Sequence, residues 1–366
     1  MVLSPHPAQA LRIEHATLST SLGDDWLTSV VAFSARRKQF RYREVDGFKL
    51  LTAPAGDVAG QDRGRERLNA LIRAAWRPMM EHLHTLPRVP TLYLLSLPAW
   101  ASGPSATSPH EASADNPALQ EFSRDLGDAC RQAGLPVHGA RAFAGGAETC
   151  HRALAHGFLA LRHDSPPAQI VLLTADSLCD HDVLLRDWRA QRIHARDNSS
   201  GWVPGEASAA LLLRPVAAAE KSPASTVLHA AAVVEAPEPS PRWPSQRAGD
   251  GRALEQAVQA ALRAAGLRLH HVRQHLSDSD GSSWRQDDMA AALGRLSASD
   301  SEHGWRAGSI QPAELLGQLG ASWGAVQWAL AAGLHRHGLA DIGQALCSTQ
   351  DIQGQCSAGV IECMAA

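Results

Sequence analysis

The sequence predicts an α/β protein built from two similar halves. Short apolar runs that are typical of buried strands alternate with amphipathic stretches that are typical of helices. A Pro-rich segment at residues 236–250 divides the chain, and a similar alternation resumes after it. The 366 residues, of which 45% are hydrophobic, can fill a sizeable core. We therefore expect a first half at residues 1–235 and a second half at residues 251–366.

Composition excludes several classes of function. The net charge is −3 with both signs dispersed, which argues against nucleic acid or an anionic membrane as the partner. No stretch reaches the roughly 18 apolar residues of a membrane span, and the N-terminus lacks a secretory pattern, so we expect a soluble, cytoplasmic protein. No CxxC pair occurs among the six cysteines, which predicts free thiols, no metal and no cofactor.

Elements of the first half follow from the apolar pattern. A strand is expected at residues 11–18, followed by a helix that Asp25 caps and that begins near Trp26. A loop of Ser, Pro and Ala is expected at residues 102–118. The other helices are expected at residues 61–85, 119–133 and 146–163, and the other strands at residues 91–97, 135–143, 169–174 and 208–214.

The second half repeats this pattern after a strand at residues 227–234. Its expected helices lie at residues 254–265, 286–296 and 320–336, its apolar segment at residues 270–276, and its closing hairpin at residues 345–348 and 359–364.

Four segments in this order resemble the β-ketoacyl synthases of the thiolase superfamily. The strongest is GWVPGEASAALLL at residues 201–213, which is similar to the family signature GFVxGEGAGxLxLE. The stretch AQIVLLTADS at residues 168–177 matches a buried strand with its acidic turn, and ARAFAGGAE at residues 140–148 matches the nucleophile elbow. The segment LLGQLGASWGAV at residues 315–326 resembles TGHxxGAAGAV. The resemblance implies a thiolase-like fold with five αβαβα layers.

At the positions that should carry the chemistry, the residues differ from those of the family. The resemblance places the catalytic cysteine at Phe143, the two catalytic histidines at Ser277 and Gln318, and the supporting lysine at Ala313. None of these side chains can form a reactive thiolate or act as an imidazole. The family's GFGGxN loop is also replaced, by STQDIQG at residues 348–354. We therefore expect a pseudoenzyme.

Residues around the expected elbow are candidates for a remaining pocket. The resemblance suggests Gly145, Gly146, Cys150, Gly205 and Glu206. A displaced nucleophile at Cys150 is an alternative to the more usual packing role of a cysteine within a helix. The run DSDG at residues 278–281 lacks the later glutamate of a calcium loop, so we expect a surface turn there.

A fold kept without its chemistry suggests selection for a binding surface. The variant segments resemble degenerate thiolase-like proteins of bacterial type VI secretion clusters, which implies an adaptor that helps to load or fold an effector or a spike-tip protein. The alternatives are a subunit that resembles a chain length factor and pairs with an active ketosynthase, and an acyl-binding protein.

Pairing of two chains is also expected from the resemblance. The family's habit of pairing through a strand implies a two-fold dimer with a continuous sheet, which we place at the strand expected at residues 169–174, from Gln169 to Thr174.

Overall fold

The computed structural model describes residues 10–56, 63–102, 116–216, 225–235, 250–299 and 305–364. Most of the loop expected at residues 102–118 and nearly all of the Pro-rich segment at residues 236–250 lie outside the described residues.

The first half contains the expected elements and three additional ones. These additional elements are the strands β2 (Arg41–Val45) and β3 (Phe48–Thr52) and the helix α5 (His181–Arg189). The others are β1 (Ala10–Thr20), α1 (Trp26–Ser34), α2 (Gly64–His84), β4 (Thr91–Pro98), α3 (Pro117–Gln132), β5 (Val137–Gly145), α4 (Thr149–Ala160), β6 (Gln169–Ser177) and β7 (Glu206–Val216).

By sheet order the second half begins with β8 (Thr226–Glu235), which lies before the boundary expected at residue 236. This half adds the short elements β10 (Gly308–Ile310) and α8 (Ala313–Leu316) to the expected pattern. Its other elements are α6 (Arg252–Ala265), β9 (Gln274–Ser277), α7 (Ser283–Ser299), α9 (Trp323–Arg336), β11 (Gln344–Gln350) and β12 (Gln355–Cys363).

Helix starts follow local capping chemistry. The Asp25 carboxylate accepts a hydrogen bond of 2.8 Å from the Thr28 N–H and caps α1, as expected. Asn116 caps α3 in the same way, with Pro117 at the first helical position, where its missing N–H costs nothing.

Strand order shows the duplication directly. The described strands form a ten-stranded sheet in the order β10-β9-β11-β12-β8-β1-β7-β6-β4-β5. In chain order within each half, both halves therefore read 3-2-4-5-1, and in each the fifth strand runs antiparallel to its neighbours. Among the described residues, two pairs, Leu11 with Leu228 and Arg12 with Val227, join β1 to β8 across the boundary.

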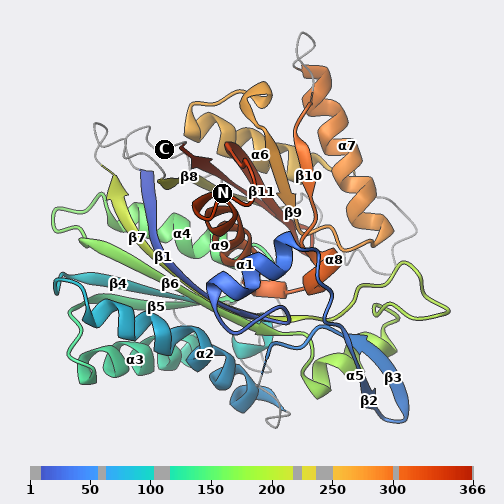
Figure 1. Ribbon diagram of the computed structural model, residues 1–366, viewed down its shortest axis with the longest axis horizontal. Helices are drawn as coiled ribbons and strands as arrows, with labels where there is room; N and C mark the ends of the chain where they lie inside the picture. Colours follow the sequence, from blue (N-terminus) through green and yellow to red (C-terminus); the bar gives the residue numbers. More distant parts are fainter. Residues whose placement is uncertain are drawn as a thin grey trace.

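The two half-sheets enclose a central helical layer (Figure 1). Helices α4 and α9 lie between the half-sheets, α2 and α3 cover the outer face of the first, and α6 and α7 cover the outer face of the second. Alternate residues of β4 point to opposite cores, since Leu92 and Leu94 pack in the central cluster whereas Tyr93 and Leu95 pack under α2 and α3. The expected five-layered thiolase-like architecture is confirmed.

The position of β6 corrects the expected pairing strand. Strand β6, which contains Gln169 to Thr174, is hydrogen-bonded to β4 on one side and to β7 on the other, so it has no free edge. The prediction failed because a continuous apolar run shows that a strand is buried but not which neighbours it has. The strands at the two ends of the sheet are β5 and β10.

Close packing of α4 against α9 requires glycine at position 324. A Cβ there would lie 2.7 Å from the Cys150 Cβ and 3.1 Å from the His151 Nδ1. We expect Gly324→Ala to lower the free energy of unfolding by about 1–3 kcal/mol, because the crossing cannot accept another carbon without moving both helices. Urea unfolding would measure this.

Gly294 in α7 is the matched control, because nothing lies within 4 Å of a Cβ built on it. Gly294→Ala should raise the free energy of unfolding by about 0.5–1 kcal/mol. Equal effects of the two substitutions would contradict the close crossing.

Candidate functional site

A pocket of about 340 Å³ opens where the carboxyl ends of parallel strands meet. Its walls come from both halves, since the turn after β5 and the end of β6 face the loop before α9 and the turn after β11. The lining residues are Pro98, Ala99, Trp100, Gly145, Gly146, Ala147, Asp176, Leu178, Arg186, Asp187, Arg192, Trp202, Arg285, Gln318, Gly320, Asp351, Ile352 and Gln353.

The turn between β5 and α4 brings two glycines to the pocket wall. A Cβ on Gly146 would lie 1.8 Å from the Asp351 Oδ2, so the carboxylate from the other half occupies the space of a side chain at this position. A Cβ on Gly145 would likewise lie 2.5 Å from the Glu148 Oε1. Two carboxylates therefore fill the space at the tip of the elbow, and glycine is what makes room for them.

Glu148 lies close enough to Asp351 at this turn to raise the pKa of the Asp351 carboxyl. Glu148 is buried and pairs with Arg152, while its Oε2 has no hydrogen-bond partner among the described residues. Asp351 accepts a hydrogen bond of 2.6 Å from the Gln353 N–H. Desolvation, followed by repulsion from Glu148, raises the pKa of Asp351 to about 6.

Gln318 holds the loop before α9 together. Its Nε2 donates a 2.9 Å hydrogen bond to the Asp280 Oδ2, and its Oε1 accepts hydrogen bonds from the Leu319 N–H and the Trp323 indole N–H. Both ends of the amide are thus engaged in structural hydrogen bonds at the position where the resemblance places a catalytic histidine.

Arg285 and the segment at residues 278–281 form a buried charge cluster. Arg285 pairs with Asp280, lies 3.5 Å from Asp278 through its Nε, and donates to the Gln350 carbonyl at 3.1 Å. Asp278 accepts from the Gln350 N–H at 2.8 Å, and desolvation raises its pKa to about 7. The expected surface turn is therefore wrong at Asp278, which is buried because Arg285 and backbone groups compensate for its lost hydration.

Asp176 closes the opposite wall. Its Oδ2 accepts a 2.7 Å hydrogen bond from the Ala321 N–H, and its Oδ1 accepts one from the Ser177 N–H. A Cβ on Gly320, whose φ is +52°, would lie 2.1 Å from the Oδ2. Desolvation raises the pKa of Asp176 to about 7 despite these hydrogen bonds.

The positions expected to have lost the catalytic groups are dispersed, apart from Gln318 in the pocket wall. Phe143 lies within β5, two residues before its end, with its ring 5.3 Å from the Arg141 guanidinium and 5.6 Å from the His156 ring. Ser277 ends β9 and is buried beside Ser348 of β11. Ala313 begins α8 and packs in the central core.

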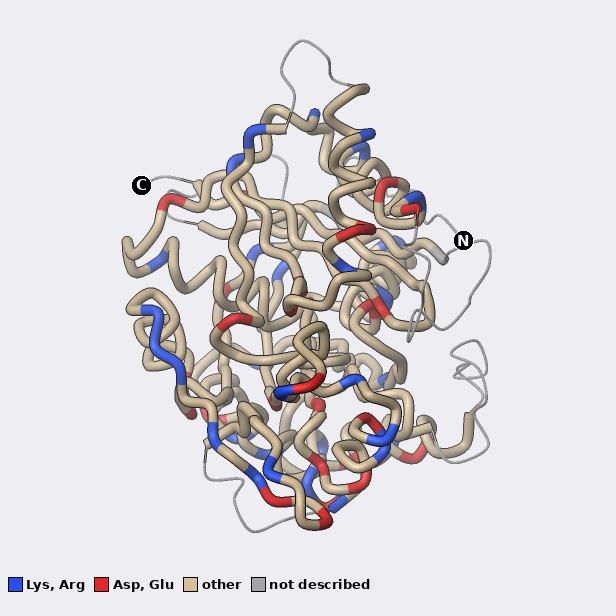
Figure 2. Tube along the Cα trace, turned by 90° about the vertical axis from the view of Figure 1, so that its right-hand side faces the viewer, with Lys and Arg blue, Asp and Glu red and all other residues tan. Residues whose placement is uncertain are grey.

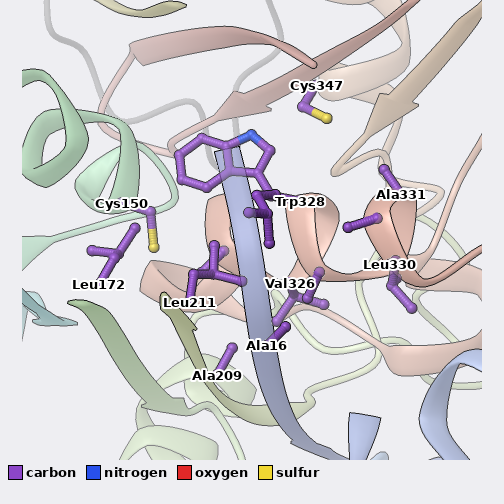
Figure 3. Close-up of a cluster of buried hydrophobic side chains, with 14 of the residues drawn as sticks. Ala16, Cys150, Leu172, Ala209, Leu211, Val326, Trp328, Leu330, Ala331 and Cys347 are labelled. Carbon is purple, nitrogen blue, oxygen red and sulfur yellow. The ribbon is translucent and has the colours of Figure 1, made fainter. Parts of the chain in front are cut away.

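Cys150 lies in the packed core and does not line the pocket. It is fully buried, its thiol donates to the Ala321 carbonyl at 3.1 Å, and desolvation raises its pKa. Figure 3 shows its sulfur beside Leu172 and Leu211 in the central cluster. All six cysteines are free and buried.

The remaining candidates divide between the pocket and the scaffold. Gly145 and Gly146 line the pocket, whereas Gly205 and Glu206 do not. Glu206 is buried in a structural ion pair with Arg67 and accepts a 2.6 Å hydrogen bond from the Ser177 hydroxyl. A Cβ on Gly205 would lie 2.3 Å from the Leu316 carbonyl oxygen, so this glycine allows two loops to approach.

Sequence reasoning missed the charged mouth of the pocket. Arg186 and Arg192 both bind the Asp187 carboxylate, at 2.9 and 3.2 Å, and Trp100 and Trp202 add aromatic walls. The pattern LLRDWRAQR at residues 184–192 contained the signal, because an aspartate between arginines on a short helix predicts a local charge network.

The chemical groups in this pocket limit what it can do. The described residues that line it include no cysteine, serine, threonine, lysine or histidine. Carboxyls with pKa values near 6 and 7 can exchange protons near neutral pH. Among the described residues, no cluster of His, Cys, Asp and Glu could hold a metal ion, and no helix is long and apolar enough to cross a membrane.

Solved structures with a similar fold are known, although the sequence itself matches no family model. No protein-family model and no curated protein matches the sequence. Among solved structures, a ketosynthase in complex with its chain length factor from Xenorhabdus doucetiae is similar, with a TM-score of 0.71 and 14% identity over 97% of this chain and 98% of that chain. The ishigamide ketosynthase/chain length factor gives a TM-score of 0.67 and 16% identity over 97% and 99%.

A type II polyketide synthase acyl-carrier protein in complex with its ketosynthase bound to the hexaketide gives a TM-score of 0.71 and 13% identity over 98% of this chain and 100% of that chain. These similarities show that the chain has the thiolase-like fold of ketosynthase and chain length factor complexes.

The raised pKa of Asp176 predicts a pH-dependent stability. Folding raises this pKa from 3.8 to about 7, so the native state keeps a proton that the unfolded chain releases. The stabilisation is complete below about pH 4 and is lost as the pH rises through about 7. Asp176→Asn, which cannot ionise, should show a smaller loss of unfolding free energy across this window, measured by urea unfolding at a series of pH values.

Asp164→Asn is the control, since Asp164 is exposed within the loop between α4 and β6. This variant should follow the wild-type pH profile. Parallel profiles of Asp176→Asn and wild type would contradict a protonated native Asp176.

Proposed function

We propose that this chain is a non-catalytic subunit with a thiolase-like fold that acts by pairing with a protein partner, in the manner of a chain length factor beside its ketosynthase. The observation that carries the proposal is the elbow turn, where Gly145, Gly146 and Ala147 line the pocket and the Asp351 carboxylate occupies the side-chain space of Gly146. A covalent acyl intermediate needs a nucleophile at such a turn.

The remaining groups of the pocket support the same conclusion. The Gln318 amide is hydrogen-bonded to Asp280 and to the loop before α9. The Arg285 guanidinium contacts two aspartates and a backbone carbonyl. Groups committed to each other in this way stabilise the wall rather than a transition state. Three arginines and three aspartates line the pocket, which also disfavours a long acyl chain as its ligand.

Edge strand β5 is the surface that suits pairing. It ends the sheet order, and the described residues place no strand beyond it. Its Ala142 N–H is turned away from β4 and donates to the Ser123 hydroxyl at 2.8 Å, so one outward group is already covered. The rest of the edge is the stretch from Val137 to Arg141, whose outward-facing main-chain groups can form hydrogen bonds with a partner strand.

Pairing with a ketosynthase-like chain is preferred here to the type VI secretion adaptor role, for which no contact or comparison offers specific support. Chain length factors in complexes with ketosynthases are among the similar structures. In this proposal, the partner is a second chain of the same fold, either a copy of this one or an active ketosynthase.

Absence of covalent chemistry predicts inert thiols. All six cysteines are buried, and desolvation raises the pKa of Cys150. Native protein treated with iodoacetamide or an acyl-coenzyme A thioester should show no adduct by intact mass, whereas the unfolded chain should alkylate at six sites. Stoichiometric acylation of Cys150 in the native protein would make the chain an enzyme and overturn the proposal.

A proline in β5 tests the pairing surface. Ala140 has the same strand parity as Ala142, so its N–H also points outward, and Ala140→Pro removes a partner contact without breaking the β4 ladder. Tagged wild type, but not Ala140→Pro, should retain a thiolase-fold chain in a pull-down from its native lysate, identified by mass spectrometry.

Ala140→Ser is the control, because it keeps the N–H and should pair like wild type. Circular dichroism of each variant establishes that it is folded. Retention of the same chain by Ala140→Pro, or capture of a secretion effector in place of any thiolase-fold chain, would contradict the proposal.

A further inference from the structure

A second concave surface lies at the end of the sheet opposite to β5. It is a groove of about 410 Å³ beside edge strand β10, between the C-terminal ends of α1 and α9 and the short helix α8. Leu315 and Leu334 form its buried floor, while Phe33, Ile310 and Leu339 form its partly exposed walls. Polar side chains complete the lining, so the groove combines an apolar floor with polar groups, as binding sites of this size usually do. They are Ser34, Arg36, Ser309, Gln311 and Glu314.

Exposed apolar side chains lead into this groove along α1. Leu27 is 50% exposed and Val31 is 46% exposed, and Ser34 continues the same stripe at the helical spacing i, i+4, i+7 and lines the groove. Leu339, on the other wall, is 38% exposed. Leu27 and Val31 are therefore exposed apolar side chains on the same face of α1 as Ser34, which joins this face to the groove.

Positive charge borders this apolar surface. Arg36, Arg37 and Lys38 follow α1 directly and are all exposed. This segment is the longest uninterrupted blue stretch of Figure 2, at its left side. Arg36 lines the groove and pairs with Glu314 at 2.6 Å, whereas no carboxylate among the described residues pairs with Arg37 or Lys38.

The local charge differs in sign from that of the whole chain. Residues 36–49 contain six basic and two acidic residues, although the chain carries a net charge of −3. Two of the three lysines of the chain, Lys38 and Lys49, lie in this segment. Of these basic residues, Arg36 lines the groove and Arg37 and Lys38 follow it in the chain, and three cations beside an apolar floor favour a ligand that is apolar on one side and anionic at its border.

We infer that the groove is the docking site for an acidic amphipathic helix of a partner protein. Apolar side chains at one helical face would enter between Phe33, Ile310 and Leu339, and carboxylates at the edge of that face would meet Arg36, Arg37 and Lys38. A nucleic acid would use the cations but not the leucine-lined floor. The inference is independent of pairing through β5, because β5 and β10 lie at opposite ends of the sheet.

A synthetic helix provides the test. The probe is a fluorescein-labelled peptide of about five turns, roughly 18 residues, with leucine at i, i+3, i+4 and i+7 positions and glutamate elsewhere. Fluorescence anisotropy on the full chain should give saturable binding that weakens with salt. The same peptide with lysine in place of glutamate, and a scrambled peptide without the apolar stripe, should bind at least about tenfold more weakly.

Two variants assign the binding to the groove. Leu339→Glu should raise the Kd about tenfold or more, because it removes an apolar wall and adds repulsion. Arg37→Glu combined with Lys38→Glu should raise the Kd about threefold to tenfold and reduce its salt dependence. The matched controls are Leu159→Glu, at a leucine that is 39% exposed on α4, and the pair Arg263→Glu with Arg268→Glu on exposed positions near the end of α6.

Several results would overturn the inference. These are the absence of saturable binding, equal binding of the lysine or scrambled peptide, and equal effects of the groove and control variants. Loss of a wild-type dimer mass in Leu339→Glu, seen by light scattering, would assign the groove to a second copy of this chain instead. Displacement of the peptide by a single-stranded oligonucleotide, with no effect of Leu339→Glu, would assign the cations to nucleic acid.

Discussion

The close crossing of α4 and α9 is the contact on which the rest of the structure depends. Gly324 lets the two helices approach so closely that a Cβ at this position would lie 2.7 Å from the Cys150 Cβ. Both half-sheets pack on this pair of helices. Helix α4 begins just after the elbow turn and α9 just after the Gln318 loop, so both N-terminal ends face the pocket. The crossing therefore fixes the pocket as well as the core.

Around that fixed frame, the pocket wall is built from polar contacts that satisfy one another. Carboxylates of Asp176 and Asp278 accept backbone N–H groups, and Arg285 and Gln318 converge on Asp280. Buried charges need such compensation because the interior does not solvate them. The pocket wall therefore joins the two halves, because its hydrogen bonds and ion pairs come from loops of both.

The sequence predicted where most helices and strands lie, but it did not predict which strands lie next to one another in the sheet. Apolar runs predicted β1 and β4 to within two residues at each end, because a run of buried side chains is a local property, but they predicted only the second half of β12. The same run in β6 could not reveal that strands flank it on both sides, since strand order depends on the whole sheet. The exposed hairpin β2–β3 was missed because its charged residues interrupt any apolar period.

Contacts within the candidate site depend on tertiary packing in a similar way. The resemblance places the position of the catalytic cysteine at Phe143. Strand β5 continues for two residues beyond Phe143, and the turn that reaches the pocket starts at Gly146. The burial of the segment at residues 278–281 required knowledge of Arg285, whose side chain reaches it from the next helix. Contacts across loops of this kind are set by tertiary packing and leave no short-range pattern in the sequence.

Asp351 couples the loop after β11 to the elbow turn at Gly146. A side chain introduced at position 146 would meet the end of the Asp351 side chain, so that carboxylate would have to turn away from the elbow turn. The side-chain space at the elbow turn of the first half is therefore set in part by a residue of the second half, and a change at position 146 would be felt at Asp351.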